Sequence, residues 1–369
     1  MRILIAPDKF KGSLSAAEVA ENIAAGLRDR LPTAEITLLP VADGGEGTAR
    51  VICAAAGGEW HACEVHDALG RIVSARYCTI ANGETAVMEI SEASGLWRIG
   101  KDERDPLNAS SFGTGEMLLD AAGRGAKEIT IGLGGSATND GGFGLARALG
   151  FRFLDAAGQE LSGPVTALRE LQHIAAPRRG WSCRITAAAD VRNPLLGERG
   201  ATRMFASQKG ATAPQIEMLE DALTRMAAVA ARDLDADFRV TSGAGAAGGL
   251  GFGLMVFCGA QLRSGFDVVA EAVGLEAAVE QVDVVITGEG RLDAQTLEGK
   301  APAGVAELAR KYGKPVYAVA GEMEEDGQLR SLFNGIFTAK GPEMSLQEAI
   351  AHAPDLLRKC GYDLASKLS

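Results

Sequence analysis

The chain opens with Arg-Ile-Leu-Ile-Ala-Pro-Asp at residues 2–8, and Ser-Ala-Ala-Glu follows at residues 15–18. An unbroken apolar run that ends in proline and aspartate is typical of a strand buried on both faces of a parallel sheet. Ser15 and Glu18 have the spacing of a capping box, which predicts that a helix begins there. Apolar residues recur every four positions over 19–27, so one face of this helix is expected to pack against a core.

The same alternation of strand and helix extends in both directions along the sequence. A strand over 36–41 and a loop over 43–48 follow the first helix, and the segment 282–320 again predicts strand, helix and strand. This order is typical of α/β proteins. We therefore expect a discontinuous Rossmann-like or flavodoxin-like parallel-sheet domain from residues 1–130 and 265–369. A second, mixed α/β domain is expected to be inserted as residues 131–264.

Composition narrows the classes of function. The 369 residues carry a formal net charge of -11, which argues against a nucleic-acid partner because no basic surface is available to replace counterions. Six cysteines without a C-x-x-C pair and four histidines without metal-ligand spacing argue against a disulfide framework or a zinc site. No apolar run is long enough for a signal peptide or a membrane span. We expect a cytoplasmic protein, with a homo-oligomer as an option.

Two glycine-rich stretches resemble nucleotide-binding loops. Gly-Leu-Gly-Gly-Ser-Ala at 132–137 follows a predicted strand, and polar residues up to 140 stand where a helix would begin. Backbone N–H groups at such a position attract phosphate or carboxylate. The stretch 243–248 fits G-x-G-x-x-G but lacks a clear preceding strand, so it is interpreted first as a tight turn. The residues interpreted as nucleotide contacts in these two loops are Gly134, Gly135, Thr138, Asp140 and Gly245.

A third glycine-containing stretch, at 95–101, nearly matches a P-loop. Asp102 replaces the required serine or threonine, and bulky Leu96 and Trp97 fill the loop. We reject this motif. No G-x-S-x-G sequence is present either, which argues against an α/β-hydrolase.

Acidic residues follow four of the predicted strands: Asp8, Asp43, Asp190 and Glu289. Ligands of open α/β sheets bind beyond the carboxyl ends of the strands, so these four side chains are candidates for one cleft. Carboxylates suit phosphoryl transfer because some can hold Mg²⁺ and another can accept the proton of the attacking hydroxyl. A single acid of this kind is at least as often a helix or turn cap. Basic residues near the same loops suggest anion contacts, with solvated surface lysines as the equal alternative: Lys9, Lys11, Lys209, Arg291 and Lys300.

Seven motifs occur in order along residues 1–350 of the chain: APDKFKGSL at 6–14, VADGGEGT at 41–48, GGSATNDGG at 134–142, Asp190 with NPL at 193–195, QKGA at 208–211, the glycines of 243–249, and TGEGRLD at 287–293. Together they resemble the type-1 bacterial glycerate kinase family. Phe-Ala-Ser at 205–207 departs from the Phe-Gly-Pro of the family, and the segment after Gly321 matches less closely.

The resemblance implies ATP as phosphoryl donor, D-glycerate as acceptor, Mg²⁺ as cofactor, and a cleft between two α/β domains. The product expected from related enzymes is 2-phosphoglycerate rather than 3-phosphoglycerate. On this hypothesis Asp190 or Asp8 is the base, and Asp43 or Glu289 holds Mg²⁺. Substrate charge and hydroxyls are assigned to Lys9, Lys11, Arg291, Ser136 and Asn139, and Lys209 to the nucleotide.

Two other classes of function remain open from the sequence. The glycine-rich loops, with Asp155 about 20 residues beyond Gly135, would also suit a nicotinamide-dependent oxidoreductase. Asp155 falls in a predicted hairpin turn rather than at a strand end, which argues against that class. A non-enzymatic sensor of small molecules on the same scaffold is the other alternative, and it predicts binding without turnover.

Overall fold

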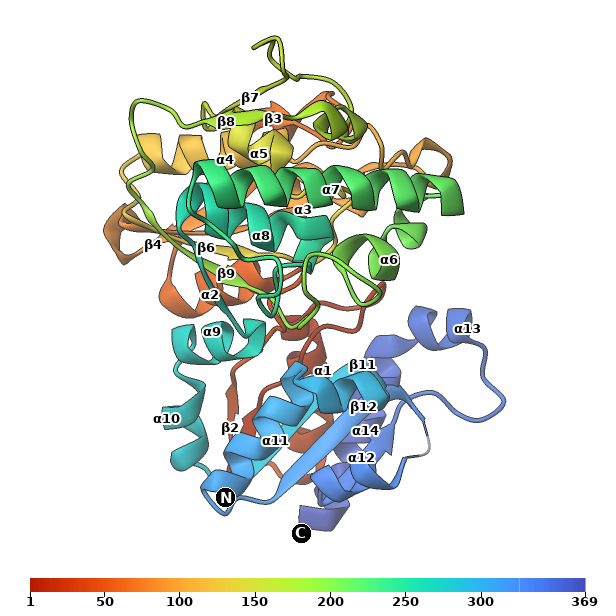
Figure 1. Ribbon diagram of the computed structural model, residues 1–369. Coiled ribbons are helices and arrows are strands. Elements are labelled where there is room, and N and C mark those ends of the chain that lie inside the picture. The colour runs from red at the N-terminus through yellow and green to blue at the C-terminus, as the bar shows by residue number, and fades with distance from the viewer. Residues whose placement is uncertain (325, 369) are drawn as a thin grey trace. The chain divides into compact units, whose positions relative to one another are not determined.

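The computed structural model describes residues 1–324 and 326–368. Contacts divide the chain into two compact units, one formed by 1–56 with 264–369 and the other by 57–263. In Figure 1 the first unit contains the red N-terminal and blue C-terminal segments, and the second contains the orange-to-green middle of the chain. The division expected from the sequence at 130/131 instead falls inside a strand of the second unit.

The first unit is built on a five-stranded sheet in which every neighbouring pair is parallel. Ile3 in the first strand aligns with Ile36 on one side and Val284 on the other, so the opening apolar run lies inside the sheet. This confirms the α/β class with a parallel sheet. The strand order is β13 (Gly335–Thr338), β12 (Val316–Met323), β11 (Val284–Leu292), β1 (Arg2–Ile5) and β2 (Glu35–Leu38).

The first helix of this unit begins where the sequence predicts. Ser15 caps the first helix, with its side chain accepting from the backbone N–H of Glu18, and Glu18 completes the capping box. Apolar positions over 19–27 are buried against the sheet and the last helix. The helices of the first unit are α1 (Ala16–Arg30), α2 (Thr48–Ala56), α9 (Gly265–Ala272), α10 (Leu275–Glu280), α11 (Ala301–Lys311), α12 (Gly327–Leu332), α13 (Leu346–Ala351) and α14 (Ala353–Leu368).

Close packing of α1 against α14 depends on Gly26. A Cβ at this position would lie 1.8 Å from the carbonyl oxygen of Arg358, so either helix would have to move. We expect Gly26→Ala to lower the free energy of unfolding by about 2–4 kcal/mol. Gly327→Ala, where a Cβ meets no atom within 4 Å, is the control and should be neutral or slightly stabilising. Urea unfolding of both variants measures the difference, and equal stabilities would contradict this packing.

The second unit contains a mixed six-stranded sheet. Its order is β10 (Gln261–Arg263), β9 (Arg184–Ala188), β6 (Glu128–Gly132), β5 (Thr85–Glu89), β4 (Ile72–Ile80) and β3 (Glu59–His66). The strands from β10 to β5 are parallel, and β4 and β3 pair antiparallel. Residues 57–130 belong to this unit because β5 pairs with β6 and the sheet continues from β5 through β4 to β3. Two short strands, β7 (Arg152–Leu154) and β8 (His173–Ala175), form a separate pair.

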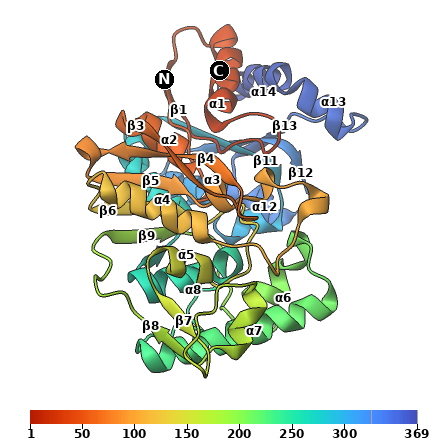
Figure 2. The ribbon, with the colours of Figure 1, turned by 90° about the horizontal axis from the view of Figure 1, so that it is seen from above.

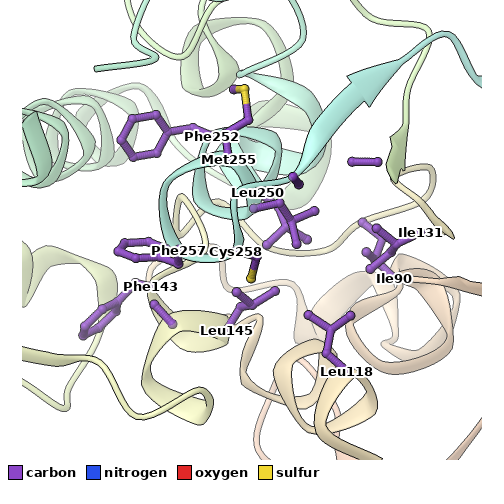
Figure 3. Packing of buried hydrophobic residues seen from close by; sticks show 14 of the residues in the cluster. Ile90, Leu118, Ile131, Phe143, Leu145, Leu250, Phe252, Met255, Phe257 and Cys258 are labelled. Carbon is purple, nitrogen blue, oxygen red and sulfur yellow. The ribbon is translucent and has the colours of Figure 1, made fainter. Parts of the chain in front are cut away.

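Helices cover this sheet with a continuous apolar core. Phe143, Leu250 and Phe257 belong to the buried cluster seen in Figure 3, and the Phe143 ring meets Phe153 edge-on at 4.8 Å. Figure 2 shows α5 and α8 near β9, and the contacts of α8 with both elements support this placement. The helices are α3 (Ser91–Ser94), α4 (Phe112–Gly123), α5 (Phe143–Ala148), α6 (Ala201–Phe205), α7 (Ala213–Asp233) and α8 (Ala246–Cys258). None of the helices in residues 1–324 and 326–368 has both the length and the apolar character needed to cross a bilayer.

Candidate active site

Carboxylates gather at the carboxyl end of the sheet in the first unit. Asp8 follows β1, and its backbone N–H donates to the carbonyl of Gly288 in β11 at 2.8 Å. The strand β11 continues to Leu292, so Glu289 lies within it rather than in a loop after it, as the sequence had suggested. Asp43 comes from the loop that precedes α2. Of the four acids expected in one cleft, these three belong to the first unit and Asp190 to the second.

Asp8 is a buried carboxylate with one close cation. Burial raises its pKa to about 6, the Lys9 ammonium lowers the pKa, and Asp43 raises it again. The Lys9 Nζ lies 3.6 Å from Asp8 and 3.5 Å from Asp43, and although burial opposes its charge, these two carboxylates raise the pKa of Lys9. The positive charge of Lys9 is therefore neutralised by Asp8 and Asp43, which disfavours its predicted role in binding the negative charge of the substrate.

Glu289 is the second buried acid of this unit. Burial raises its pKa to about 7, and the charges of Asp8 and Asp293 add to that effect. Thr296 Oγ1 donates to Glu289 Oε1 at 2.6 Å, and the Lys300 Nζ lies 3.8 Å from both Glu289 and Asp293. A cation bound near these oxygens would stabilise their ionised forms, which burial destabilises.

The first unit's carboxylates fit Mg²⁺ in its usual manner of binding. Residues 1–324 and 326–368 contain no group of three or more His, Cys, Asp or Glu side chains arranged to hold a metal by themselves. Mg²⁺, however, is commonly held by one or two carboxylates together with substrate phosphates and water. Asp8, Asp43 and Glu289 offer such hard oxygen donors, and their electrostatic environment favours a bound cation.

Two other predicted substrate cations, Lys11 and Arg291, also belong to the first unit. Lys11 is exposed to solvent. Arg291 lies in β11 opposite Glu322 of β12, its side chain is 53% exposed, and it hydrogen-bonds to Glu324. The guanidinium is also 3.6 Å from Asp293. Because β11 extends as far as Leu292, Arg291 lies beside the carboxylates of the neighbouring strand, and these carboxylates pair with its positive charge. The structure therefore gives no support for Arg291 as an anion-binding group.

In the second unit, three adjacent parallel strands deliver polar residues to one edge of the sheet. Glu89 ends β5, the loop 134–140 follows β6, and Asp190 follows β9. The registers Glu89↔Gly132 and Gly132↔Ala188 place these strand ends side by side. This edge is where ligands of parallel sheets bind. The sequence prediction missed Glu89, which is 7% exposed, although an acid directly after the apolar run 86–88 is the same signal that identified Asp190.

Asp140 holds the loop 134–140 in shape. Its carboxylate accepts hydrogen bonds at 2.8–3.1 Å from the backbone and hydroxyl of Ser111 and from the backbone N–H groups of Gly142 and Gly144. All of these donors belong to the chain, and the side chain is 1% exposed. Asp140 is therefore placed to position the loop rather than to contact the nucleotide, as the sequence had suggested.

Lys209 is the central cation of this unit. It is 3% exposed and lies at the end of a short 3₁₀ turn, Ser207–Lys209. Its Nζ donates to Ser136 Oγ at 2.9 Å and to the carbonyl of Thr138 at 2.6 Å. Burial lowers the pKa of Lys209 to about 7, while the charge of Asp140 raises it. Because Asp140 is hydrogen-bonded elsewhere, the buried ammonium is poised for an added anion.

Several polar groups beside Lys209 have unused hydrogen-bonding capacity. In the described part of the chain, the buried Thr138 Oγ1 and Asn139 Oδ1 have no hydrogen-bond partner, while Asn139 Nδ2 donates to Thr202 Oγ1 at 3.0 Å. Nor does any hydrogen bond among the described residues use the N–H groups of Gly134, Gly135 or Ser136. Buried polar atoms are nearly always satisfied by protein, water or ligand. The loop and Lys209 together can bind an anion and a hydroxyl group.

The second glycine-rich stretch packs directly on this loop. Gly248 has φ +68°, and a Cβ there would lie 2.1 Å from the Thr138 carbonyl oxygen and 2.9 Å from Lys209 Nζ. Gly245, predicted as a nucleotide contact, allows close packing instead, because its Cβ would lie 2.3 Å from the carbonyl oxygen of Pro194. The preference for a turn over a ligand loop in 243–248 therefore agrees with this geometry.

A substitution at Gly248 tests whether the Lys209 contacts depend on the close packing of this glycine. We expect Gly248→Ala to destabilise the protein by about 2 kcal/mol more than Gly259→Ala and to lower anion affinity. Gly259 has a similar φ of +65° at the end of the same helix but no atom within 4 Å of a Cβ, so it controls for backbone strain. Chemical unfolding and phosphate titration of the two variants measure both effects. Equal behaviour of the two would contradict the close approach.

Comparisons with known proteins agree on one family. The model of the glycerate kinase family matches residues 3–369. The chain is 42% identical to a glycerate kinase of Bacillus subtilis (strain 168) and 42% identical to a glycerate 2-kinase of Escherichia coli (strain K12), covering 100% of this chain and 98% of each relative. A crystal structure of glycerate kinase 2 from Salmonella typhimurium LT2 superposes with a TM-score of 0.88 at 43% identity, covering 100% of this chain and 98% of that one.

Proposed function

This chain belongs to the glycerate kinase family, a family of phosphotransferases, and we propose that it transfers the terminal phosphoryl group of ATP to D-glycerate. The observation that carries this proposal is the Lys209 site: a buried amine, held by Ser136 and Thr138, beside polar atoms that have no partner among the described residues. Such a site demands an anion, and both ATP and glycerate are anionic. We favour 2-phosphoglycerate as the product, and the name of the Escherichia coli relative supports this choice.

The second unit suits the acceptor and its activation. A carboxylate or phosphate oxygen near Lys209 would complete the coordination of the ammonium and raise its protonated fraction. Asn139 Oδ1, a buried acceptor without a partner among the described residues, can accept a hydrogen bond from a substrate hydroxyl. Asp190, at the neighbouring strand end, is our choice for the base that accepts the proton of the attacking hydroxyl.

The first unit suits the metal-bound donor. Asp8, Asp43 and Glu289 are the side chains of which one or two would hold Mg²⁺, with the phosphates and water completing its shell. The bound ion would neutralise charge on the transferring phosphoryl group. Before a metal ion binds, Lys9 limits the repulsion between Asp8 and Asp43, since its ammonium lies within 3.6 Å of both. We prefer Asp8 as a metal ligand rather than the base because it lies among other carboxylates.

The oxidoreductase alternative receives no support from the loop that would bind the ribose. Asp155 Oδ1 accepts from the backbone N–H groups of Ala157 and Gln159, both at 2.8 Å, so it closes its own turn. A fluorescence titration with NADH and with ATP separates these classes. We expect ATP to bind and NADH not to.

The assay for the proposed function is ADP release that depends on D-glycerate, followed by phosphorus NMR of the product. Ligand binding without ADP release would favour a sensor.

The pH dependence of the reaction follows from the three shifted groups. Asp8 and Glu289 have pKa values raised to about 6 and about 7, so protonation impairs metal binding as the pH falls through this range. Lys209 has a pKa lowered to about 7, so its charge is lost as the pH rises. A bound anion would move this limb upward only in the profile of kcat, since kcat/KM reports the free enzyme. We expect a bell-shaped profile of kcat/KM that is narrow and centred near neutral pH. A flat profile from pH 5.5 to 9.5 would contradict these assignments.

A further inference from the structure

The turn that carries Lys209 is short and exposed on one side. Gln208 is exposed while Lys209 is buried, and Gly210 closes the turn with φ +100°. The ammonium reaches Ser136 and Thr138 only if this turn keeps its place. A contact that fixes the turn therefore also fixes the position of the charge.

Arg104 makes two contacts with this turn. Its Nη1 donates to the carbonyl oxygen of Gln208 at 2.8 Å. The backbone and Cβ of Arg104 also pack against Gly210, since a Cβ on that glycine would lie 2.9 Å from both the Cβ and the carbonyl oxygen of Arg104. Arg104 lies 105 positions before Lys209 in sequence, between the rejected P-loop stretch and α4, where no motif would have drawn attention to it.

We propose that Arg104 is a positioning residue, which fixes the Gln208–Gly210 turn so that the Lys209 ammonium stays against Ser136 and Thr138. The proposal rests on the proposed function in one respect, that Lys209 binds the anionic group of a substrate. Arg104 acts through the turn and not by its own contact with that substrate. Asp140 is the charged group that acts on Lys209, and Arg104 hydrogen-bonds to the turn. Arg203 lies on α6, which also contacts the turn, but its guanidinium pairs with Glu198 and Glu217.

The chemistry of arginine suits this task. The guanidinium is planar and charged at all relevant pH values, so its hydrogen bond to the Gln208 carbonyl has a fixed direction. Its Nε is buried and has no hydrogen-bond partner among the described residues. The hydrogen bond from Nη1 to Gln208 is therefore a main restraint on the guanidinium. Glutamine at this position would leave the turn less restrained. Water would then reach Lys209, and its pKa would rise from about 7 toward its ordinary value.

The test compares Arg104→Gln, Arg104→Lys and Arg98→Gln in the full chain. Arg98 is a matched control, because its Nε is also buried without a partner in the described chain and its Nη2 also donates to a carbonyl, that of Ser74, at 2.8 Å. We expect Arg104→Gln to lower kcat/KM at pH 7 about 10- to 100-fold, as for a reactive group displaced by about 1 Å. The basic limb of its pH profile should move to higher pH. Arg104→Lys keeps the charge and a donor but not the fixed direction, so it should recover only part of the loss, and Arg98→Gln should leave the limb unchanged.

A second readout does not need turnover. Acetic anhydride modifies neutral amines, and mass spectrometry of the peptide that contains Lys209 gives its rate of acetylation. We compare the limiting rates reached at high pH, where the amine is neutral in every variant and a change in pKa does not mask a change in access. We expect this limiting rate to rise in Arg104→Gln, because the turn opens, and to stay at the wild-type value in Arg98→Gln. Unchanged rates and an unchanged pH limb in Arg104→Gln, or equal changes in Arg98→Gln, would overturn the proposal. Absence of glycerate phosphorylation by the wild-type chain would instead refute the proposed function, while the acetylation rates still decide the role of Arg104.

Discussion

Replacing Lys209 by methionine is expected to lower kcat/KM for D-glycerate phosphorylation by about 10³-fold at pH 7 without lowering Tm. The loss follows from removing the buried Lys209 ammonium, which donates to Ser136 and Thr138 of the anion loop, residues 134–140. The unchanged or higher Tm follows from the sign of the pKa shift. A lysine whose pKa falls from 10.5 to about 7 on folding costs stability at neutral pH, and this cost disappears with the charge.

The measurement is steady-state kinetics together with thermal unfolding without ligands. Lys311→Met is the control, because that side chain is 62% exposed and pairs with Glu276 on the surface. It should leave kcat/KM within about twofold. A Lys209→Met variant that keeps wild-type kcat/KM would remove Lys209 from the site. A variant that loses both activity and 10 °C or more of Tm, as roughly expected for a broken core, would show that Lys209 is structural.

Replacing Asp190 by asparagine has the second large expected effect, a fall in kcat of about 10²- to 10⁴-fold with little change in KM. Asparagine keeps the shape of the side chain but cannot accept the hydroxyl proton. Asp190 follows β9, next to the strand that carries the anion loop. The assay is the initial rate as a function of glycerate, ATP and Mg²⁺ concentrations.

Asp8→Asn is the comparison that separates a base from a metal ligand. We expect this variant to need more Mg²⁺ and to regain part of its rate at high Mg²⁺ concentration, because one oxygen ligand of the proposed metal site is lost. Asp190→Asn should show no such rescue. If instead Mg²⁺ rescues Asp190→Asn and leaves Asp8→Asn inactive, the two roles must be exchanged.

The charged forms of the buried groups in both units lower the stability of the fold. Asp8 and Glu289 have raised pKa values, so the stability that they contribute is present below pH 4 and lost as the pH rises through about 6 to 7. Lys209 has a lowered pKa, so its contribution is present above pH 10.5 and lost as the pH falls through about 7. Near neutral pH all three groups are partly charged in surroundings that disfavour charge. Binding of opposite charge by ligands would offset this cost.

The sequence predicted the parts of the fold that depend on local patterns. The capping box at Ser15 and the apolar run 2–6 determine the first helix and strand almost by themselves, and both were identified. The family was identified from its loops, which the comparisons confirm. The grouping of β3 to β5 with the middle of the chain was missed, because strand pairing between distant segments has no local signature.

The site was harder to predict because proximity depends on side-chain partners. Lys209 and Ser136 were selected from their glycine turns, and the structure brings them into contact. Arg291 was selected on the same grounds, yet its partners are Glu322 of β12 and Glu324 just after it, and the sequence does not show that this strand is adjacent. Thr202 and Arg104 had no signal, since their importance comes only from contacts with residues far away in the chain.

Phosphorus NMR of the purified chain incubated with ATP, Mg²⁺ and D-glycerate tests the central claim most directly, with the Lys209→Met variant recorded in parallel. We expect the γ-phosphate signal of ATP to be replaced by signals of ADP and of a phosphomonoester on the secondary carbon of glycerate, and this conversion to stop almost completely in the variant. Conversion at an equal rate in the two proteins, or no glycerate-dependent phosphomonoester from the wild-type chain, would contradict that claim.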